Sequence, residues 1–243
     1  MALVHSPSIV LDKLAFYMDA LSPKCYSGSG TSVKDVSNNG YDGTLNGLGS
    51  QVSYNASVGS FDFTGGNGAS IAYPESNISK DPSLILTGVS GEITHEAWCF
   101  PTSITASRRI MSTDRSDFNC LMWSSNNRVE WSVDNAQFFS NNNTFSGNKW
   151  WHIVGTASRA AGTTNNIRIY RNGELIKTNS RNLRNPMGDG TARPFAIGSN
   201  VEGTVQNNNC FIGKIAIIRI YGKALSATEI KQNYNASRGR FGL

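Results

Sequence analysis

Short runs of β-branched and aromatic residues alternate with clusters of Gly, Asn, Ser and Pro along almost the whole chain. The runs favour β-strands and the clusters favour turns, so the pattern predicts an antiparallel sandwich or barrel in one domain. Only 16% of the residues are charged, which is unlike a protein built from long helices. We expect strands at Leu11–Asp19, Gly59–Phe63, Ser70–Tyr73, Gly91–Phe100, Arg109–Ser112, Asn119–Trp123, Arg128–Val133, Trp150–Ala157, Asn166–Arg171, Glu174–Thr178, Phe195–Gly198 and Cys210–Tyr221.

Two segments give the sharpest local predictions. The pair Asn172-Gly173 suits the two positive-φ positions of a type I′ turn, so it predicts a β-hairpin between the runs on either side of it. In Cys210–Tyr221 both alternating sets of side chains are largely apolar. This strand is therefore expected near the centre of a sheet, covered on both faces, with Ile215 and Ile217 buried.

A helical pattern occurs at Ser226–Tyr234, where Ser226 and Glu229 form a capping-box sequence and Leu225 can contact Ile230 as a hydrophobic staple. We expect one short helix that closes the domain. Residues 1–10 are predicted to be an N-terminal arm, residues 11–235 the sandwich, and residues 236–243 a C-terminal tail. The tail combines cations with an aromatic ring, a composition enriched in interfaces, so we expect it to dock onto a partner through Arg238, Arg240 and Phe241.

The charge distribution argues against several classes of protein. The chain has 22 Lys and Arg residues and 17 Asp and Glu residues, which gives a net charge of +5. Arg108-Arg109 is the only adjacent basic pair. Nucleic-acid binders cluster their basic residues, so no nucleic-acid partner is expected. The apolar run Ile215–Ile218 is far shorter than the roughly 20 residues of a membrane helix, so no membrane partner is expected either.

The N-terminus and the cysteines bear on the compartment. Met1–Ser8 has neither a basic region nor an apolar core, so we expect no secretory export. Four cysteines, Cys25, Cys99, Cys120 and Cys210, lie far apart in the sequence without a metal-binding spacing. We expect them to be reduced, buried thiols.

Several short motifs occur in a fixed order along the chain: Phe16–Ala20, Asp35–Leu45, Ser60–Gly65, Ile93–Trp98, Trp151–Thr156, Ile169–Gly173, Phe211–Ile215 and Arg219–Ile230. In this order, from Leu14 to Tyr234, the chain resembles the concanavalin A-like lectin/glucanase superfamily, specifically its laminin G-like modules. The resemblance implies an all-β, two-sheet antiparallel jelly roll. The ending Asn233–Gly242 is similar to laminin G-like virion proteins of tailed bacteriophages, which implies a place on a virion assembled in the host cytoplasm.

Catalysis by a carboxylate pair is not expected. Glycosidases place two carboxylates about 5 to 10 Å apart, whereas Glu92 and Glu96 share one strand face with Cα atoms roughly 13 Å apart. The Glu-x-Asp-x-x-Glu strand of laminarinase-like members of the superfamily is absent from the sequence. Nor do His5, His95 and His152 stand beside a recognisable nucleophile. We therefore expect a protein that is not an enzyme.

Calcium is the one cofactor that the sequence raises. The segment Asp35-x-Ser37-x-Asn39-Gly40 copies the first half of a calcium loop, but its twelfth position is Asn46 instead of an acid. Laminin G-like modules often hold calcium at the rim of the sandwich, so the resemblance implies a site at Asp35, Ser37 and Asn39 or at Asp19. The alternative is a turn stabilised by the Asp35 side chain.

Aromatic residues beside Asn- and Ser-rich loops are the candidates for binding sugars. Trp150 and Trp151 are adjacent in an expected strand, so one faces the core and the other faces solvent or a partner. Aromatic rings next to amide and hydroxyl groups are typical of carbohydrate sites. The candidates are Trp123, Trp131, Phe138, Phe139 and Trp150, and the alternative for each is a place in the core.

Together these features predict a non-enzymatic virion structural protein: a capsid decoration, head fibre or tail-associated adhesin. Its partners would be other virion proteins and host surface polysaccharide, and many copies would compensate for weak single sites, so a homo-oligomer or multi-copy display is expected. The alternative is a soluble carbohydrate-active enzyme or a free lectin.

Overall fold

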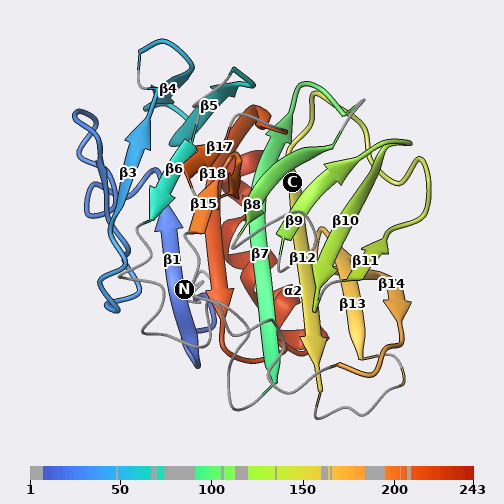
Figure 1. Cartoon of the computed structure of the whole chain (residues 1–243). Coiled ribbons are helices and arrows are strands. Elements are labelled where there is room, and N and C mark those ends of the chain that lie inside the picture. Colours follow the sequence, from blue (N-terminus) through green and yellow to red (C-terminus); the bar gives the residue numbers. More distant parts are fainter. Residues whose placement is uncertain are drawn as a thin grey trace.

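The structure, a computed structural model, describes residues 8–47, 49–66, 70–73, 91–104, 107–112, 120–134, 136–159, 164, 166–183, 195–202, 204–206 and 209–243. Residues 1–7, which include His5, lie outside the described part. Two antiparallel sheets of eight strands each pack face to face as a sandwich, and a helix lies behind one of them (Figure 1). This confirms the expected all-β jelly roll.

The first sheet, sheet A, holds the long strands of the molecule. Its order is β14 (Glu174–Asn179), β13 (Ile167–Arg171), β12 (Trp151–Ser158), β7 (Glu92–Pro101), β18 (Ile212–Tyr221), β5 (Ser60–Thr64) and β4 (Val52–Asn55), and β1 (Leu14–Asp19) also pairs with β18. Sheet B runs β11 (Ala136–Phe139), β10 (Arg128–Val133), β9 (Cys120–Ser124), β8 (Arg108–Ser112), β15 (Phe195–Ile197), β6 (Ser70–Tyr73), β3 (Gly43–Asn46) and β2 (Ser32–Val33). A separate hairpin pairs β16 (Asn200–Glu202) with β17 (Thr204–Gln206).

The main core fills the space between the inner faces of the two sheets. It includes Trp123 and Trp131 of sheet B, which are fully buried. Gly155 on β12 makes room for Trp131, because a Cβ at this position would lie 2.5 Å from the indole Cδ2. A glycine is therefore needed inside this strand because the Trp131 ring packs directly against the backbone, and not because the chain turns there. Cys25, Cys99 and Cys210 are buried and not in disulfides, as expected, and the side chain of Cys120 lies outside the described part.

Strand β18 is covered on both faces, as its two apolar sets predicted. Ile215 belongs to the core between the sheets, whereas Ile217 belongs to a second cluster on the outer face of sheet A. Residues with this spacing normally face the same side, but the register with β7 shifts between Ile215 and Ile217. The extra residue of a β-bulge turns the following side chains over. Both isoleucines are buried, as predicted.

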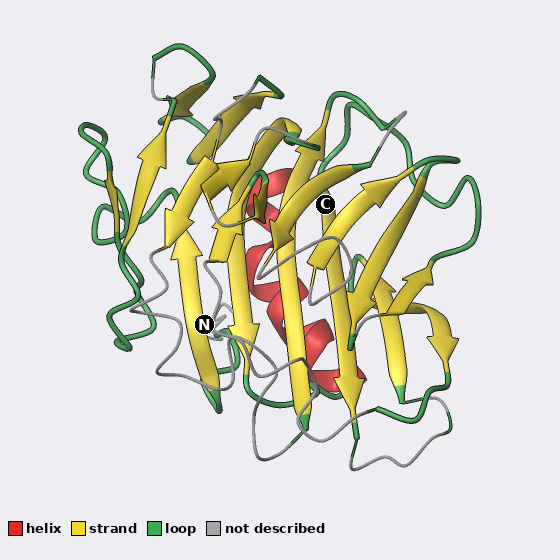
Figure 2. Cartoon of the chain, viewed as in Figure 1, coloured by secondary structure: helices red, strands yellow, loops and turns green. Residues whose placement is uncertain are grey.

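The predicted hairpin and helix are both present. Asn172 and Gly173 take φ values of 52° and 77° between β13 and β14, as a type I′ turn requires. Helix α2 (Ala227–Ser237) begins after Ser226, whose side chain forms the expected capping box with Glu229. The helix packs on the face of sheet A that points away from sheet B (Figure 2). In the described part of the chain, no helix is long and apolar enough to cross a membrane.

The expected C-terminal tail is part of the fold. Helix α2 continues into the 3-10 helix η1 (Arg238–Phe241), and the Phe241 ring is buried against the outer cluster of sheet A. Arg240 donates from Nη1 to Asp19 Oδ1 at 2.6 Å and from Nε to the carbonyl of Val58 at 2.9 Å. The expectation that Arg240 and Phe241 are free for a partner is therefore wrong, because both are occupied within the chain; Arg238 is exposed.

The end of the expected N-terminal arm also packs on the sandwich. Val10 is buried in a cluster with Leu225 and Ile230, the two residues of the predicted staple. Its N–H donates to Asn233 Oδ1 at 2.8 Å, and its carbonyl accepts a hydrogen bond from the Tyr221 hydroxyl at 3.1 Å. The sandwich therefore begins before residue 11.

Candidate functional site

A group of buried charges joins sheet A to helix α2. Glu96 on β7 accepts a hydrogen bond from Arg219 Nη1 at 2.5 Å, and its Oε1 lies 3.0 Å from His152 Nε2. Its other oxygen accepts from Asn233 Nδ2 of α2 at 2.7 Å. All four side chains are buried. Opposite charges and hydrogen bonds thus satisfy the carboxylate where water is excluded.

The electrostatics of this group suit a structural role. Burial alone raises the pKa of Glu96, but Arg219 and hydrogen bonds from His152 and Asn233 lower it to about 2. Burial lowers the pKa of Arg219, and Glu96 raises it above its ordinary value. Glu96 is therefore a carboxylate at neutral pH and cannot donate a proton as a general acid. Glu92, four residues before Glu96 on the same face of β7, accepts from Ser158 Oγ at 2.6 Å.

A group of exposed and partly exposed side chains lies at the β9–β10 turn and beside β11, at one edge of sheet B. We call it the amide–aromatic surface. It consists of Asn126, Asn127, Arg128, Phe139 and Asn143. The Arg128 guanidinium carbon lies 3.9 Å from the centre of the Phe139 ring, a cation–π geometry that holds both side chains in place.

Hydrogen bonds fix the loops of this surface. The Asn143 N–H donates to the carbonyl of Asn126 at 2.9 Å, and Asn127 Nδ2 donates to Asn143 Oδ1 at 3.3 Å. All three asparagines have positive φ, a conformation that Asn tolerates better than other side chains. Arg128 Nε is buried and has no hydrogen-bond partner among the described residues. The surface therefore offers the N–H donors of its exposed amides, Asn126 and Asn143, beside a partly exposed ring.

Of the five aromatic residues expected to bind sugar, the structure brings Phe139 alone to this surface. Trp123 and Trp131 are fully buried, and their rings pack edge-on against Phe145 and His95, with centroids 4.9 Å and 4.8 Å apart. The expectation that they bind sugar is corrected: both are core residues. Phe138, on the opposite face of β11 from Phe139, packs against the core between the sheets.

Trp150 lies on the other side of the molecule. Its ring is partly buried, 4.5 Å from Phe241 and 5.6 Å from Phe100, on the outer face of sheet A. Trp151 instead packs against the core between the sheets, so adjacent tryptophans do face opposite ways. The Trp150 ring is therefore covered by Phe241 of the same chain.

The residues expected to hold calcium serve other contacts. Asp35 Oδ1 accepts from the N–H groups of Tyr17 and Ser37 at 3.0 and 2.9 Å, and its Oδ2 accepts from Ser37 Oγ at 2.8 Å. Asn39 Nδ2 donates to the carbonyl of Ala15 at 2.8 Å, and Asp19 pairs with Arg240. Within the described residues, no group of three or more His, Cys, Asp or Glu side chains could hold a metal ion. This geometry is that of a turn stabilised by Asp35.

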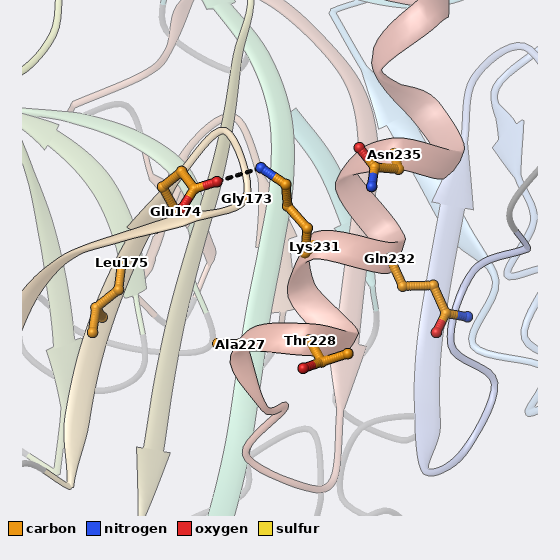
Figure 3. A pocket seen from close by; sticks show the side chains of 8 residues that line it. All are labelled: Gly173, Glu174, Leu175, Ala227, Thr228, Lys231, Gln232 and Asn235. Carbon is orange, nitrogen blue, oxygen red and sulfur yellow. Dashed lines mark hydrogen bonds and ion pairs between the residues drawn. The ribbon is translucent and has the colours of Figure 1, made fainter.

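An open groove of about 570 Å³ runs between helix α2 and the turn of the β13–β14 hairpin (Figure 3). Lys231 on the helix and Glu174 on β14 point toward each other and form an ion pair across it (Figure 3). Leu175 is 48% exposed at its edge. None of the described residues that line the groove is aromatic, so it lacks a ring on which a sugar could stack.

Sequence reasoning missed most of the amide–aromatic surface. Phe139 was among the candidates, but Asn126, Asn127, Arg128 and Asn143 were seen only as part of Asn-rich loops. The sequence feature that could have indicated this surface is a pair of Asn clusters, one directly before β10 and one directly after β11. Only the pairing of these strands shows that the two clusters meet.

Two antiparallel sheets packed face to face define a β-sandwich of the jelly-roll type. The chain belongs to the concanavalin A-like lectin/glucanases superfamily, because the family model Laminin_G_3 of that superfamily matches residues 65–231. This confirms the family expected from the ordered motifs. No curated protein sequence matches the chain.

Solved structures share the fold at low sequence identity. The binding domain of Paraclostridial Mosquitocidal Protein 1 is similar with a TM-score of 0.66 and 20% identity, over 93% of this chain and 52% of that one. Trypanosoma rangeli sialidase gives 0.63 and 12%, over 98% and 36%. Domain 4 of AbnA, a GH43 extracellular arabinanase from Geobacillus stearothermophilus solved with arabinotriose, gives 0.62 and 16%, over 91% and 98%. The chain thus spans about half or less of the first two structures and nearly all of the third.

Proposed function

We propose that this protein is a non-enzymatic glycan-binding domain that attaches a larger particle to a surface polysaccharide. The observation that carries the proposal is the amide–aromatic surface, where a partly exposed Phe139 ring lies under Arg128 beside the amides of Asn126, Asn127 and Asn143. The stacked guanidinium and ring together form a flat surface for the C–H groups of a sugar, and the nearby amides can bind its hydroxyls.

Two of the similar structures support this class of ligand. One is the binding domain of a toxin, and another is an arabinanase domain in complex with arabinotriose. Because these proteins share the fold at low identity, they support a binding role without naming the sugar. The proposal also gives the protein a place on a tailed-phage virion, as a decoration, head fibre or tail adhesin displayed in many copies. This part rests on the similarity of the segment Asn233–Gly242 to laminin G-like virion proteins of tailed phages.

Binding of labelled bacterial polysaccharides to the purified protein tests the site. Phe139→Ala should weaken binding by about tenfold or more, because the ring and its support of the Arg128 guanidinium are lost. Leu11→Ala is the matched control, since Leu11 is 70% exposed and lies just before β1, a strand of sheet A. Equal binding by both variants, with unchanged thermal midpoints, would place the sugar elsewhere and reject this surface.

The rival functions are a carbohydrate-active enzyme and a free lectin. We expect no hydrolysis of β-glucans above background, because Glu96 is a buried, paired carboxylate. A hydrolytic rate that falls on the order of a thousandfold in Glu92→Gln or Glu96→Gln would establish an enzyme instead. The free lectin is distinguished by mass spectrometry of purified virions, in which a virion protein is present and a free lectin is not.

A further inference from the structure

The chain around the amide–aromatic surface has long stretches without acidic residues. No Asp or Glu occurs at positions 118–129, 135–173 or 175–188. These stretches include the β9–β10 turn, strand β11, the loop from β11 to β12, strand β13 and most of β14. Strands β11 and β14 are the edge strands of the two sheets on this side of the sandwich (Figure 1). The basic side chains of this edge therefore have few acidic neighbours in the sequence.

Three cations from these stretches surround the loop at residues 140–145, which follows β11. From β13, Arg171 Nη1 donates to the carbonyl of Thr144 at 2.6 Å. From β14, Lys177 Nζ donates to Asn141 Oδ1 at 3.2 Å. The third cation begins β10, next to the turn that is hydrogen-bonded to the same loop. We call the three side chains the cationic rim: Arg128, Arg171 and Lys177.

The contacts of the cationic rim hold its side chains in place but do not cancel their charge. Their partners are a backbone carbonyl, an amide oxygen and the Phe139 ring. Within the described part of the chain, none of the three cations forms an ion pair. Arg128 donates no hydrogen bond to a described residue, and of its three nitrogens only Nε is buried. Its two Nη groups therefore reach solvent.

Two acidic residues lie near the cationic rim, and both are engaged elsewhere. Glu130, two residues after Arg128 on β10, is 2% exposed and accepts a hydrogen bond within its own strand. Glu174 lies opposite Arg171 in the β13–β14 hairpin and forms its ion pair with Lys231 of helix α2. The cationic rim thus presents positive charge with no acidic partner among the residues that the structure describes.

The loop inside the cationic rim carries amides. Asn141, Asn142 and Asn143 are exposed in succession. From Asn141 to Thr144 the chain advances three residues, at most about 11 Å, so the contacts of Lys177 and Arg171 lie within that distance of each other. Amide groups donate and accept hydrogen bonds, as sugar hydroxyls require, whereas Arg and Lys favour carboxylates. Both kinds of group are thus available to one ligand.

We propose that the glycan bound at the amide–aromatic surface is an acidic polysaccharide, with its carboxylates at the cationic rim and its hydroxyls at the amides of the loop. The proposal rests on the proposed function in taking the ligand to be a glycan, and it names the class. Each charge contact at an exposed surface is weak. Three cations on different strands therefore favour a chain with repeated carboxylates over a single small anion, because linked contacts add up.

The probes are oligogalacturonate and its methyl ester, which have the same sugar chain with and without charge. By isothermal titration calorimetry, the acid should bind about tenfold or more tightly than the ester. Added salt should remove this difference, because it screens charges at a surface. Equal affinities at low salt would overturn the assignment of an acidic ligand. Polyglutamate carries carboxylates on a polypeptide, and binding as tight as that of oligogalacturonate would overturn the assignment of a sugar.

Variants of the cationic rim test the location. Lys177→Gln removes one charge but keeps a donor for the loop, so it should weaken binding of oligogalacturonate by about threefold or more and leave binding of the ester unchanged. Lys24→Gln is the matched control. It makes the same change at an exposed lysine before β2, the strand at the opposite edge of sheet B from β11. Equal weakening by both variants would reduce the effect to net charge and reject the cationic rim. Arg171→Gln has the same expected result and gives the answer if Lys177→Gln does not fold.

The acidic ligand and the proposed function can fail separately. If the ester binds as tightly as the acid and Phe139→Ala weakens binding of both, the acidic ligand is rejected and the glycan-binding function stands. If a neutral bacterial polysaccharide binds and oligogalacturonate does not, the acidic ligand is rejected in the same way.

Discussion

The ring of Phe241 stacks on the ring of Trp98, with centroids 4.3 Å apart and planes 18° from parallel. Trp98 lies on β7 in the middle of sheet A, and Phe241 lies in the last helical turn of the chain. Trp150 packs 4.5 Å from the same phenylalanine ring. The C-terminal segment therefore completes the apolar cover of sheet A beyond the end of helix α2.

Phe241→Ala should lower the free energy of unfolding by about 3 to 5 kcal/mol, because the buried ring leaves a cavity beside two tryptophans. Deletion of Arg238–Leu243 should have at least this effect. Urea unfolding followed by tryptophan fluorescence measures it. Leu243→Ala, which alters an exposed side chain of the same segment, is the control and should change the stability by less than about 0.5 kcal/mol. An unchanged unfolding midpoint for Phe241→Ala would show that the segment is not part of the folded unit.

Ile217→Ala should cost about 2 to 5 kcal/mol, since it removes buried methyl groups from the cluster under Phe241 and Tyr234. Leu11→Ala serves as the comparison, because Leu11 is largely exposed. Chemical denaturation of both variants gives the values. A loss below about 0.5 kcal/mol for Ile217→Ala is the scale of surface substitutions and would contradict the placement of this strand.

Local signals predicted the long strands, the Asn172-Gly173 turn and the Ser226 cap, because each depends on residues near in sequence. Short strands such as β3, β4 and β11 were not predicted. Four residues hold too little pattern, and these segments become strands only by pairing with β6, β5 and β10.

The same limit explains the errors in the site. Arg238–Leu243 has the composition of a solvated tail, and only contacts with Trp98 and Asp19, more than a hundred positions earlier, make it part of the fold. Trp123 and Trp131 lie beside polar loops in the sequence, but the alternation of β9 and β10 directs both rings inward. The Glu96–Arg219 pair left no sequence signal, since its partners lie on different strands.

Glu96→Gln should destabilise the protein by about 3 to 5 kcal/mol at neutral pH, because it leaves the buried Arg219 without its counter-charge. The pKa of Glu96 is held at about 2, below its ordinary 4.5, so its stabilising contribution is complete above pH 4.5 and is lost as the pH falls toward 2. The variant should therefore show a weaker dependence of stability on pH in that window.

Glu92→Gln is the matched control for this prediction, since it makes the same change on the same face of β7, at a partly exposed carboxylate. Thermal unfolding between pH 2 and pH 7 measures both variants. Equal losses at neutral pH would mean that the pairing with Arg219 contributes nothing specific to stability.

His95 lies on the core side of β7, and neither ring nitrogen has a hydrogen-bond partner among the described residues. Burial lowers its pKa from 6.5 to about 3, so the folded protein keeps the imidazole neutral where the unfolded chain binds a proton. Stability should consequently fall as the pH drops from 6.5 toward 3, by up to about 1.4 kcal/mol per pH unit.

His95→Leu removes this pH-dependent loss of stability and the two unsatisfied nitrogens, so it should stabilise the protein by about 1 to 3 kcal/mol at pH 8. The gain should be about 2 kcal/mol larger at pH 5, as measured by urea unfolding at both values. Ile93→Leu, a buried neighbour on the same strand face, is the control and should show no such pH dependence. If the gain from His95→Leu is the same at pH 8 and pH 5, the imidazole of the folded protein takes up a proton at its ordinary pKa, and it is not the dry core residue described above.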